Sequence, residues 1–322
     1  TNPAVLAALA GVRNYGGTTL EEFDLCSYRW FANHELDPQP LAPPPDPLVQ
    51  GGLMHAVLER LYKERVGGDA LPRPGSLAAW TSRGREILAA VVAERELGAH
   101  PAELAMRRRV ERLLERFLAE EAARETGGFE PWLLEAGFGA AEVDAERPPL
   151  ELGGWGLHGA IDRVDRSPDG RTVVVDYKLS GTVTPREKFE ERAKLQLPLY
   201  LLAAADLWGG TPVGGLYHAL RGTSTRRPRG IVAAESSADL AGYELYPRDV
   251  VPEEELNELL AATRGRAATI VARIRSGEIR RDPGPREGLR GHDVCPAFCE
   301  YAPICRRDRA PAYEEDWEVE ER

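Results

Sequence analysis

The stretch of sequence that decides the fold is GAIDRVDRSPDGRTVVVDYKLS, residues 159–180. Two runs rich in apolar and β-branched residues flank a central Ser-Pro-Asp-Gly, which is a strong turn signal, so the stretch predicts a β-hairpin. In a tight hairpin the numbers of paired residues would sum to about 337 or 338, which places Asp162 opposite Val175 or Asp176. Strand alternation puts Asp176 and Lys178 on one face. The hairpin therefore gathers two carboxylates and a lysine.

Two adjacent carboxylates are destabilising unless a cation lies between them, and a divalent metal ion is the simplest such cation. A plainer interpretation also fits the residues, in which Asp162 and Asp176 are solvated strand acids and Lys178 is their surface counter-ion. The run of three valines directly before Asp176 favours a buried site instead. Lys178 is also one of only four lysines, against 37 arginines, and an ammonium group can lose a proton where a guanidinium cannot.

The composition is that of an ordinary globular chain. Its 322 residues include 41 Lys plus Arg and 52 Asp plus Glu, a net charge of −11. No run approaches the roughly 20 apolar residues of a membrane helix, and the start has no secretion signal pattern, so we expect an intracellular, cytoplasmic protein. Because the first residue is Thr1 and not Met, we expect a processed product or a domain cut from a longer polypeptide, and a stand-alone enzyme also fits. The acid excess does not exclude DNA as a partner, since DNA needs only a local basic track.

Outward from the hairpin, the sequence periodicity predicts a single α/β domain over residues 1–322 with a mixed sheet. Further strands are expected over residues 132–139, 213–220 and 229–234, and helices over 51–64, 80–123 with a break near 98–101, 185–208 with a bend at Pro198, and 252–279. A helical lead-in runs to residue 36, and residues 307–322 form an acidic tail. The helices at 80–123 are interpreted as an insertion.

Four motifs carry a resemblance to a known family. GAIDRVD at 159–165 and VDYK at 175–178 resemble motifs II and III of the PD-(D/E)XK nucleases in their RecB-like branch, Gly51-x-x-x-His55 resembles motif I, and QLPLY at 196–200 resembles the Gln/Tyr motif. They occur in the order of that branch, and the resemblance covers about residues 18–306. It implies a restriction-endonuclease-like core, a mixed sheet flanked by helices. It also implies metal-dependent hydrolysis of DNA single strands or ends, by the nuclease part of a DNA-repair helicase-nuclease.

The resemblance also implies how a metal centre would be built. Asp162 and Asp176 would give oxygen ligands to Mg²⁺ or Mn²⁺, the Tyr177 carbonyl would join them, and His55 would add a nitrogen ligand. Lys178 would orient or deprotonate the attacking water.

Three further residues are candidates for the same site. Gln196 and Tyr200 are four residues apart, so on a helix they share a face and could reach the site or a DNA backbone. Spacing alone equally allows a core tyrosine beside a surface glutamine. Glu135, on the strand before the hairpin, resembles a family glutamate and would add another acid.

The four cysteines form a second candidate site. Cys295, Cys299 and Cys305 lie within eleven residues, far along the chain from Cys26, and this is unlike the two close pairs of a zinc ribbon. Four thiolates suit zinc or a 4Fe-4S cluster, and the residues do not decide between them. The arrangement resembles the iron-sulfur subgroup of AddB-type helicase-nucleases, although that subgroup usually has two residues, not three, between the first two C-terminal cysteines. It implies a cluster that clips the two ends of the domain together.

Arginines are the candidates for DNA contact. We expect the loop that carries Arg221, Arg226, Arg227 and Arg229 to bind DNA, with residues 107–109 and 280–281 as further basic candidates. A helicase subunit or domain is the implied protein partner. Two other functions fit the residues: a catalytically silent iron-sulfur module that binds DNA or scaffolds a repair complex, and a metal hydrolase acting on a small molecule.

Overall fold

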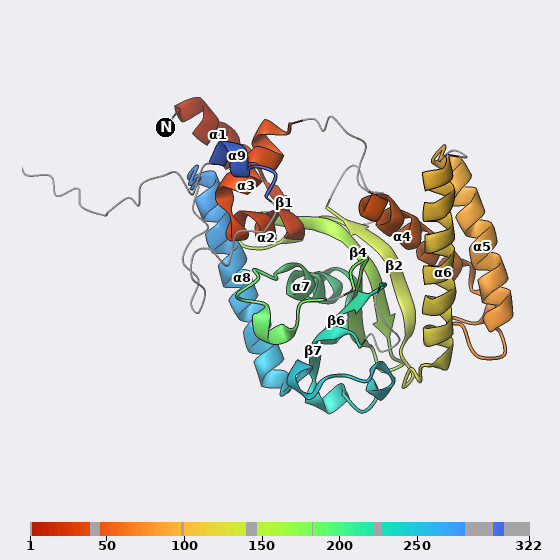
Figure 1. Ribbon diagram of the computed structural model, residues 1–322. Coiled ribbons are helices and arrows are strands. Elements are labelled where there is room, and N and C mark those ends of the chain that lie inside the picture. Colours follow the sequence, from red (N-terminus) through yellow and green to blue (C-terminus); the bar gives the residue numbers. More distant parts are fainter. Residues whose placement is uncertain are drawn as a thin grey trace, which may run out of the picture.

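The expected hairpin lies at the middle of an eight-stranded mixed sheet in a computed structural model (Figure 1). The structure describes residues 2–38, 46–97, 100–139, 147–181, 183–221, 227–280 and 299–305. Arg226, Cys295 and the acidic tail at 307–322 lie outside the described residues. The strands are β1 (Asn14–Gly16), β2 (Glu130–Phe138), β3 (Leu150–Glu151), β4 (Gly156–Arg166), β5 (Arg171–Lys178), β6 (Thr211–Ala219), β7 (Arg229–Ala233) and β8 (Val250–Val251).

Nine α-helices are found in the described part of the chain. They are α1 (Pro3–Gly11), α2 (Gly17–Leu25), α3 (Ser27–Phe31), α4 (Asp46–Glu64), α5 (Leu77–Glu94), α6 (Pro101–Ala123), α7 (Gln196–Trp208), α8 (Glu253–Arg275) and α9 (Ala302–Cys305). None of these helices is long and apolar enough to cross a membrane.

The sheet order is β1-β4-β5-β6-β7-β8, and β2 and β3 also pair with β4. β4 and β5 are antiparallel with Arg163 opposite Val175 and Val164 opposite Val174, so paired numbers sum to 338, within the expected register. The ladder between them ends at Arg163, whereas β2 continues beside β4 as far as Gly159. Beyond Arg163 the two strands of the hairpin therefore part, and Asp162 and Asp176 stand where they separate.

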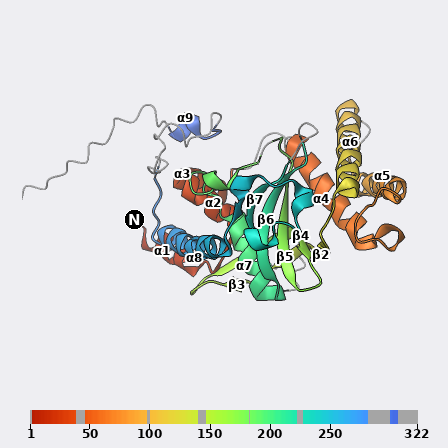
Figure 2. The same cartoon turned by 90° about the horizontal axis from the view of Figure 1, so that it is seen from below.

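Helices cover both faces of this sheet (Figures 1 and 2). α7 forms the crossover between the parallel strands β5 and β6 and packs on both, and α8 and α2 pack on α7. On the other side, α4 lies against β2 and carries the α5–α6 hairpin. The apolar stripe of α4 is buried at Leu53, Val57, Leu58 and Leu61, as its spacing predicted. The expected α/β class with a mixed, helix-flanked sheet is confirmed.

Two features differ from the sequence expectation. The helix expected from residue 185 begins only at Gln196, so Pro198 falls in its first turn, where its missing N–H costs no helical hydrogen bond. The lead-in is not wholly helical, because Asn14–Gly16 form β1 and pair in parallel with β4. A three-residue strand that contains glycine leaves no periodicity to detect, and only the pairing with β4 defines it.

Candidate active site

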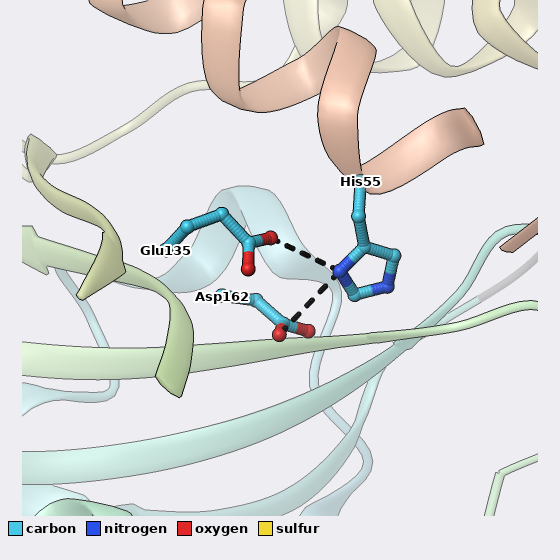
Figure 3. Close-up of side chains that lie close together, drawn as sticks. All are labelled: His55, Glu135 and Asp162. Atoms are coloured by element: carbon cyan, nitrogen blue, oxygen red, sulfur yellow. Dashed lines mark hydrogen bonds and ion pairs between the residues drawn. The ribbon is translucent and has the colours of Figure 1, made fainter. Parts of the chain in front are cut away.

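Three elements bring a histidine and two carboxylates together (Figure 3). His55 on α4 places its Nδ1 atom 3.0 Å from Glu135 Oε1 on β2 and 3.5 Å from Asp162 Oδ1 on β4. The ligand atoms of these three residues all lie within 4.8 Å of one another. One nitrogen and several carboxylate oxygens form a donor set that suits Mn²⁺ or Mg²⁺.

Glu135 reaches this group through an unusual backbone conformation. Its φ angle is +44°, in the left-handed region, although its neighbours Leu134 and Ala136 pair regularly with Arg163 and Ile161 of β4. A non-glycine residue in this region costs about 1–3 kcal/mol, and such residues concentrate at functional sites. The irregularity interrupts the alternation of β2 at the point where the carboxylate meets His55.

Asp162 and Asp176 are neighbours across the parted strands, as the register predicted. Asp162 Oδ2 accepts a hydrogen bond of 2.7 Å from the Tyr177 N–H, so a side chain takes over where the backbone ladder ends. The Asp176 side chain is 3 % exposed, and its Oδ2 lies 2.7 Å from Lys178 Nζ. The predicted placement of Asp176 and Lys178 on one face is thus confirmed, and the burial of the Asp176 carboxylate excludes its interpretation as a solvated strand acid.

The charges of this site are not balanced. Burial, the neighbouring Asp176 and, further, Glu135 raise the pKa of Asp162 to about 8, against the effect of His55 and the Tyr177 N–H. Burial also raises the pKa of Asp176, although Lys178 opposes this. Burial works against protonation of His55, but the hydrogen bond to Glu135 and the surrounding carboxylates outweigh it and raise its pKa to about 9. We call Glu135, Asp162 and Asp176 the acid cluster, and its electrostatics favour the binding of an added cation.

A polar chain continues from the acid cluster into α7. Lys178 Nζ donates to Gln196 Oε1 at 3.0 Å, and Gln196 Nε2 donates to the Tyr200 hydroxyl at 3.3 Å. Gln196 and Tyr200 therefore share a helix face, and Gln196 reaches the site, whereas Tyr200 is buried and packs against Phe138, as the core-tyrosine alternative allowed. Tyr200 also explains the glycine of the GAIDRVD motif, because a Cβ atom on Gly159 would lie 2.8 Å from the tyrosine oxygen. Lys178 lines a cavity of about 370 Å³ together with Lys194.

Glu21 is a site residue that the sequence analysis missed. It is buried on α2, and its carboxylate accepts hydrogen bonds of 2.8 Å from the N–H groups of Leu195 and Gln196 and lies 2.8 Å from Lys194 Nζ. It thereby fixes the start of α7 and with it the position of Gln196. The partners are more than 170 residues apart, and no local pattern marks such a contact.

A second group of buried charges lies behind the acid cluster. Arg163 is bidentate to Asp165 at 2.5 and 2.7 Å, and its Nη1 donates to Glu121 at 2.8 Å. Glu121 also pairs with Arg124 at 2.5 Å. We call these four residues the buried ion network.

The buried ion network joins the elements that carry the site. Arg163 Nη1 donates to the hydroxyls of Tyr62 at 3.1 Å and Tyr177 at 3.2 Å. Tyr62 is on α4, two turns after His55, and Tyr177 lies between Asp176 and Lys178 on β5. With Glu121 on α6 and Arg163 on β4, the network ties four elements together and so positions the acid cluster.

The three described cysteines lie where the two ends of the described chain meet. Cys26 is between α2 and α3, Cys299 precedes α9, and Cys305 is the last residue of α9. Tyr301, directly before α9, donates a hydrogen bond to Asn33 near α3. Among the residues that the structure describes, no cysteine belongs to a group of metal-ligating atoms close enough to share an ion.

The arginines of the expected DNA-binding loop have different surroundings. Arg229 pairs with the fully buried Asp249 at 2.6 Å and with Glu187 at 3.2 Å, and Arg227 lies 3.3 Å from Glu244. Arg221 instead donates to Gln50 on α4 and lines a separate cavity.

The fold and the candidate site together point to one class of protein. A family model described as the PD-(D/E)XK nuclease superfamily matches residues 17–306, and the chain belongs to that superfamily, as the four motifs indicated.

The chain is similar to a particular member of that class as well. It is 30 % identical over 348 residues to an ATP-dependent helicase/deoxyribonuclease subunit of Moorella thermoacetica (strain ATCC 39073 / JCM 9320). The match covers 90 % of this chain and 29 % of the relative, so the chain spans less than a third of that protein's length. The similarity supports the expected AddB-type branch.

Proposed function

We propose that this chain is a metal-dependent deoxyribonuclease acting on single strands or ends, as the nuclease part of a DNA-repair helicase-nuclease. The observation that carries the proposal is the acid cluster between the parted strands of the hairpin, with His55 and Lys178 on either side of it. The name of the Moorella thermoacetica relative supports DNA as the substrate and a helicase subunit or domain as the partner.

The residues of the site would divide the chemistry between them. His55, Glu135 and Asp162 would hold the divalent ion, and Asp176 and the Tyr177 backbone would complete its surroundings. When bound, such an ion acidifies a water molecule and stabilises negative charge on the phosphate.

Lys178 and its neighbours would act on the reacting groups directly. Although burial opposes the charge of Lys178, the nearby Asp176 outweighs this and raises its pKa, so the ammonium keeps its proton and can orient a water or a phosphate oxygen. Gln196 holds the lysine in place. Burial raises the pKa of Tyr200 to about 12, so its hydroxyl remains a donor at neutral pH.

A nuclease assay tests this proposal. Single-stranded DNA labelled at either end is incubated with Mg²⁺ or Mn²⁺, with and without EDTA, using the wild type, Asp176→Asn and Asp206→Asn. Asp206 is an exposed acid on α7 that pairs with Arg264, so it controls for the loss of one carboxylate. We expect metal-dependent cleavage that only Asp176→Asn abolishes. DNA binding without cleavage by the wild type would instead favour the silent DNA-binding module.

We also propose that Cys26, Cys295, Cys299 and Cys305 hold a 4Fe-4S cluster. The proximity of the described end segments supports this, because Tyr301 and Asn33 are in contact across 268 residues. Closing a loop of that length is worth about 5 kcal/mol in the chain-entropy model, so the role would be structural. Protein purified without oxygen should be brown, with iron and sulfide in equal amounts, and Cys26→Ala should lose the colour. Colourless protein with stoichiometric zinc would contradict the cluster.

A further inference from the structure

A basic groove lies beside the candidate active site, between α4, α6 and the end of β6. It is a cavity of about 740 Å³, and most of the side chains that line it are polar. These are Gln50, Arg109, Arg112, Glu115, Arg116 and Arg221, with Leu113. Its one acid, Glu115, is bound by Arg85 of α5 at 2.5 Å. The four arginines outnumber this one carboxylate, so the residues that line the groove carry a net positive charge.

The arginines of the groove form a row along α6. Arg109, Arg112 and Arg116 are spaced by three and four residues, so they share one flank of the helix and extend over about 10 Å of its axis. This exceeds the ~3.4 Å axial spacing of phosphates along one strand of duplex DNA, so the row can contact more than one phosphate. Arg112 is exposed and has no ion-pair partner in the described part of the chain. Its guanidinium is therefore available to an outside anion.

The inner wall of the groove is fixed by hydrogen bonds. Arg116 Nη2 donates to the Leu220 carbonyl at 3.3 Å, and Arg221 donates to the side chain of Gln50. These contacts hold Arg221 against α4 and hold α6 against the end of β6. The groove is thus built from ordered side chains of three elements.

The groove is continuous with the parts that carry the candidate active site. The ends of β5 and β6 lie at the same edge of the sheet, where Lys178 pairs with Ala219, and the Arg221 N–H donates to the Ser180 carbonyl at 3.2 Å. Gln50 is five residues before His55 on α4. The cavity at Lys178 is lined by residues 47–48, so only the first turn of α4 separates it from the groove.

We infer that this groove binds the phosphate backbone of the DNA strand whose scissile phosphate lies at the acid cluster. The inference rests on the proposed nuclease function and extends it by naming the path of the substrate. Arginine forms paired hydrogen bonds to phosphate oxygens, and such phosphate contacts read no base sequence, so the groove would hold any single strand. It makes the row on α6, rather than the whole loop that begins at Arg221, the main DNA contact.

The test compares two double variants of equal charge. Arg109→Gln with Arg112→Gln removes the two exposed arginines of the row, whereas Arg73→Gln with Arg264→Gln removes two exposed arginines outside the groove. Binding of a fluorescent oligothymidine is measured in EDTA at several NaCl concentrations. We expect the groove variant to bind about 10-fold more weakly, with a salt slope reduced by about 1.4, or about 0.7 per arginine. The control should change less than two-fold. Equal losses in both variants, or no loss in the groove variant, would overturn the inference.

A small substrate separates this inference from the nuclease proposal. Bis(p-nitrophenyl) phosphate is a phosphodiester too short to reach the groove from the acid cluster. The groove variant should hydrolyse it at the wild-type rate with Mn²⁺ while its KM for DNA rises, and a parallel loss on both substrates would count against a strand-binding role. If the wild type cleaves neither substrate, the nuclease proposal fails. The binding comparison in EDTA still decides whether the groove binds DNA.

Discussion

Asp162 and Arg163 are adjacent in β4, but they belong to two groups of buried charge with different balances. In the buried ion network, Arg124 and Arg163 face Glu121 and Asp165, so two positive and two negative charges give a net charge of zero. In the acid cluster, the cationic partners of the three carboxylates among the described residues are only Lys178 and the titratable His55.

This difference in charge balance distinguishes the residues that support the site from those to which we assign its chemistry. In the network, burial opposes ionisation of Glu121, but Arg124 and Arg163 outweigh it and hold its pKa well below the usual range. In the acid cluster the pKa values of Asp162 and Asp176 rise instead, so their ionised forms cost stability. A protein tolerates such a group where a cation completes it and where neighbouring structure keeps it in place.

Lys178→Gln is expected to give the largest effect. Its loss should lower DNA cleavage by 10³–10⁴-fold, about 4–5.5 kcal/mol of transition-state stabilisation. Lys178→Arg should not restore cleavage, because the fork of a guanidinium does not fit the place of a compact ammonium. Lys63→Gln, an exposed lysine on α4, is the control. Substantial cleavage by Lys178→Gln would show that this residue takes no part in the reaction.

Glu121→Gln tests the buried ion network in the same way. It leaves Arg163 and Arg124 without a buried counter-charge, so urea unfolding at pH 7 should show a loss of about 3–5 kcal/mol. Because the folded pKa of Glu121 is lowered, its contribution exists above the unfolded pKa of ~4.3 and fades as the pH falls below it. The difference in free energy of unfolding between Glu121→Gln and the wild type should therefore become smaller at acidic pH.

The control for that experiment is Glu115→Gln on the same helix. Glu115 also pairs with an arginine, but both partners are partly exposed to solvent, so the unfolding midpoint should stay close to wild type. Similar losses in the two variants would mean that burial is not what makes Glu121 important.

Divalent metal should stabilise the acid cluster and leave the network unaffected. At 100-fold over its Kd, Mn²⁺ is expected to add about 2.7 kcal/mol to the stability of the metal-free protein, seen as a rise in melting temperature. Glu135→Gln should lose most of this rise, whereas Glu130→Gln, an exposed glutamate on the same strand, should keep it. An equal rise in both variants would place the ion elsewhere.

The smallest expected effect is that of Asp162→Asn. This substitution should stabilise the protein, whereas substitution in the buried ion network should destabilise it. The pKa of Asp162 is about 8 in the folded chain, so ionisation of this group lowers stability as the pH rises from ~4 to 8. In metal-free buffer at pH 8.5, the free energy of unfolding of Asp162→Asn should therefore exceed that of the wild type by about 0.5–2 kcal/mol. Asp165→Asn, three residues along β4, should have a lower free energy of unfolding than the wild type, because Arg163 loses its bidentate partner. Destabilisation by both would contradict the proposed contrast.

Much of the site follows from local spacing. The turn sets the register that places Asp162 beside Asp176, strand alternation puts Lys178 next to Asp176, and four residues on a helix bring Gln196 to Tyr200. In each case the partners lie on one element or on two strands joined by a short loop. The backbone geometry between them is then nearly fixed by the sequence.

The remaining features depend on contacts across the whole chain. The positive φ angle of Glu135 arises where β2 passes β4 and α4, and Glu21 meets the start of α7 from 174 residues away. The row of arginines on α6 becomes a groove only because Arg221 is held beside it by Gln50.

The sequence by itself therefore determined the α/β class, the hairpin and the pairs of side chains that local geometry brings together. Only the tertiary structure decided which buried charges are neutralised. Asp162 and Arg163 follow one another on β4. The hairpin register places Asp162 beside Asp176, but no local rule states that His55 and Glu135 join them or that Arg163 meets Glu121. That outcome is electrostatic, and it depends on which distant helices pack against the two faces of the strand.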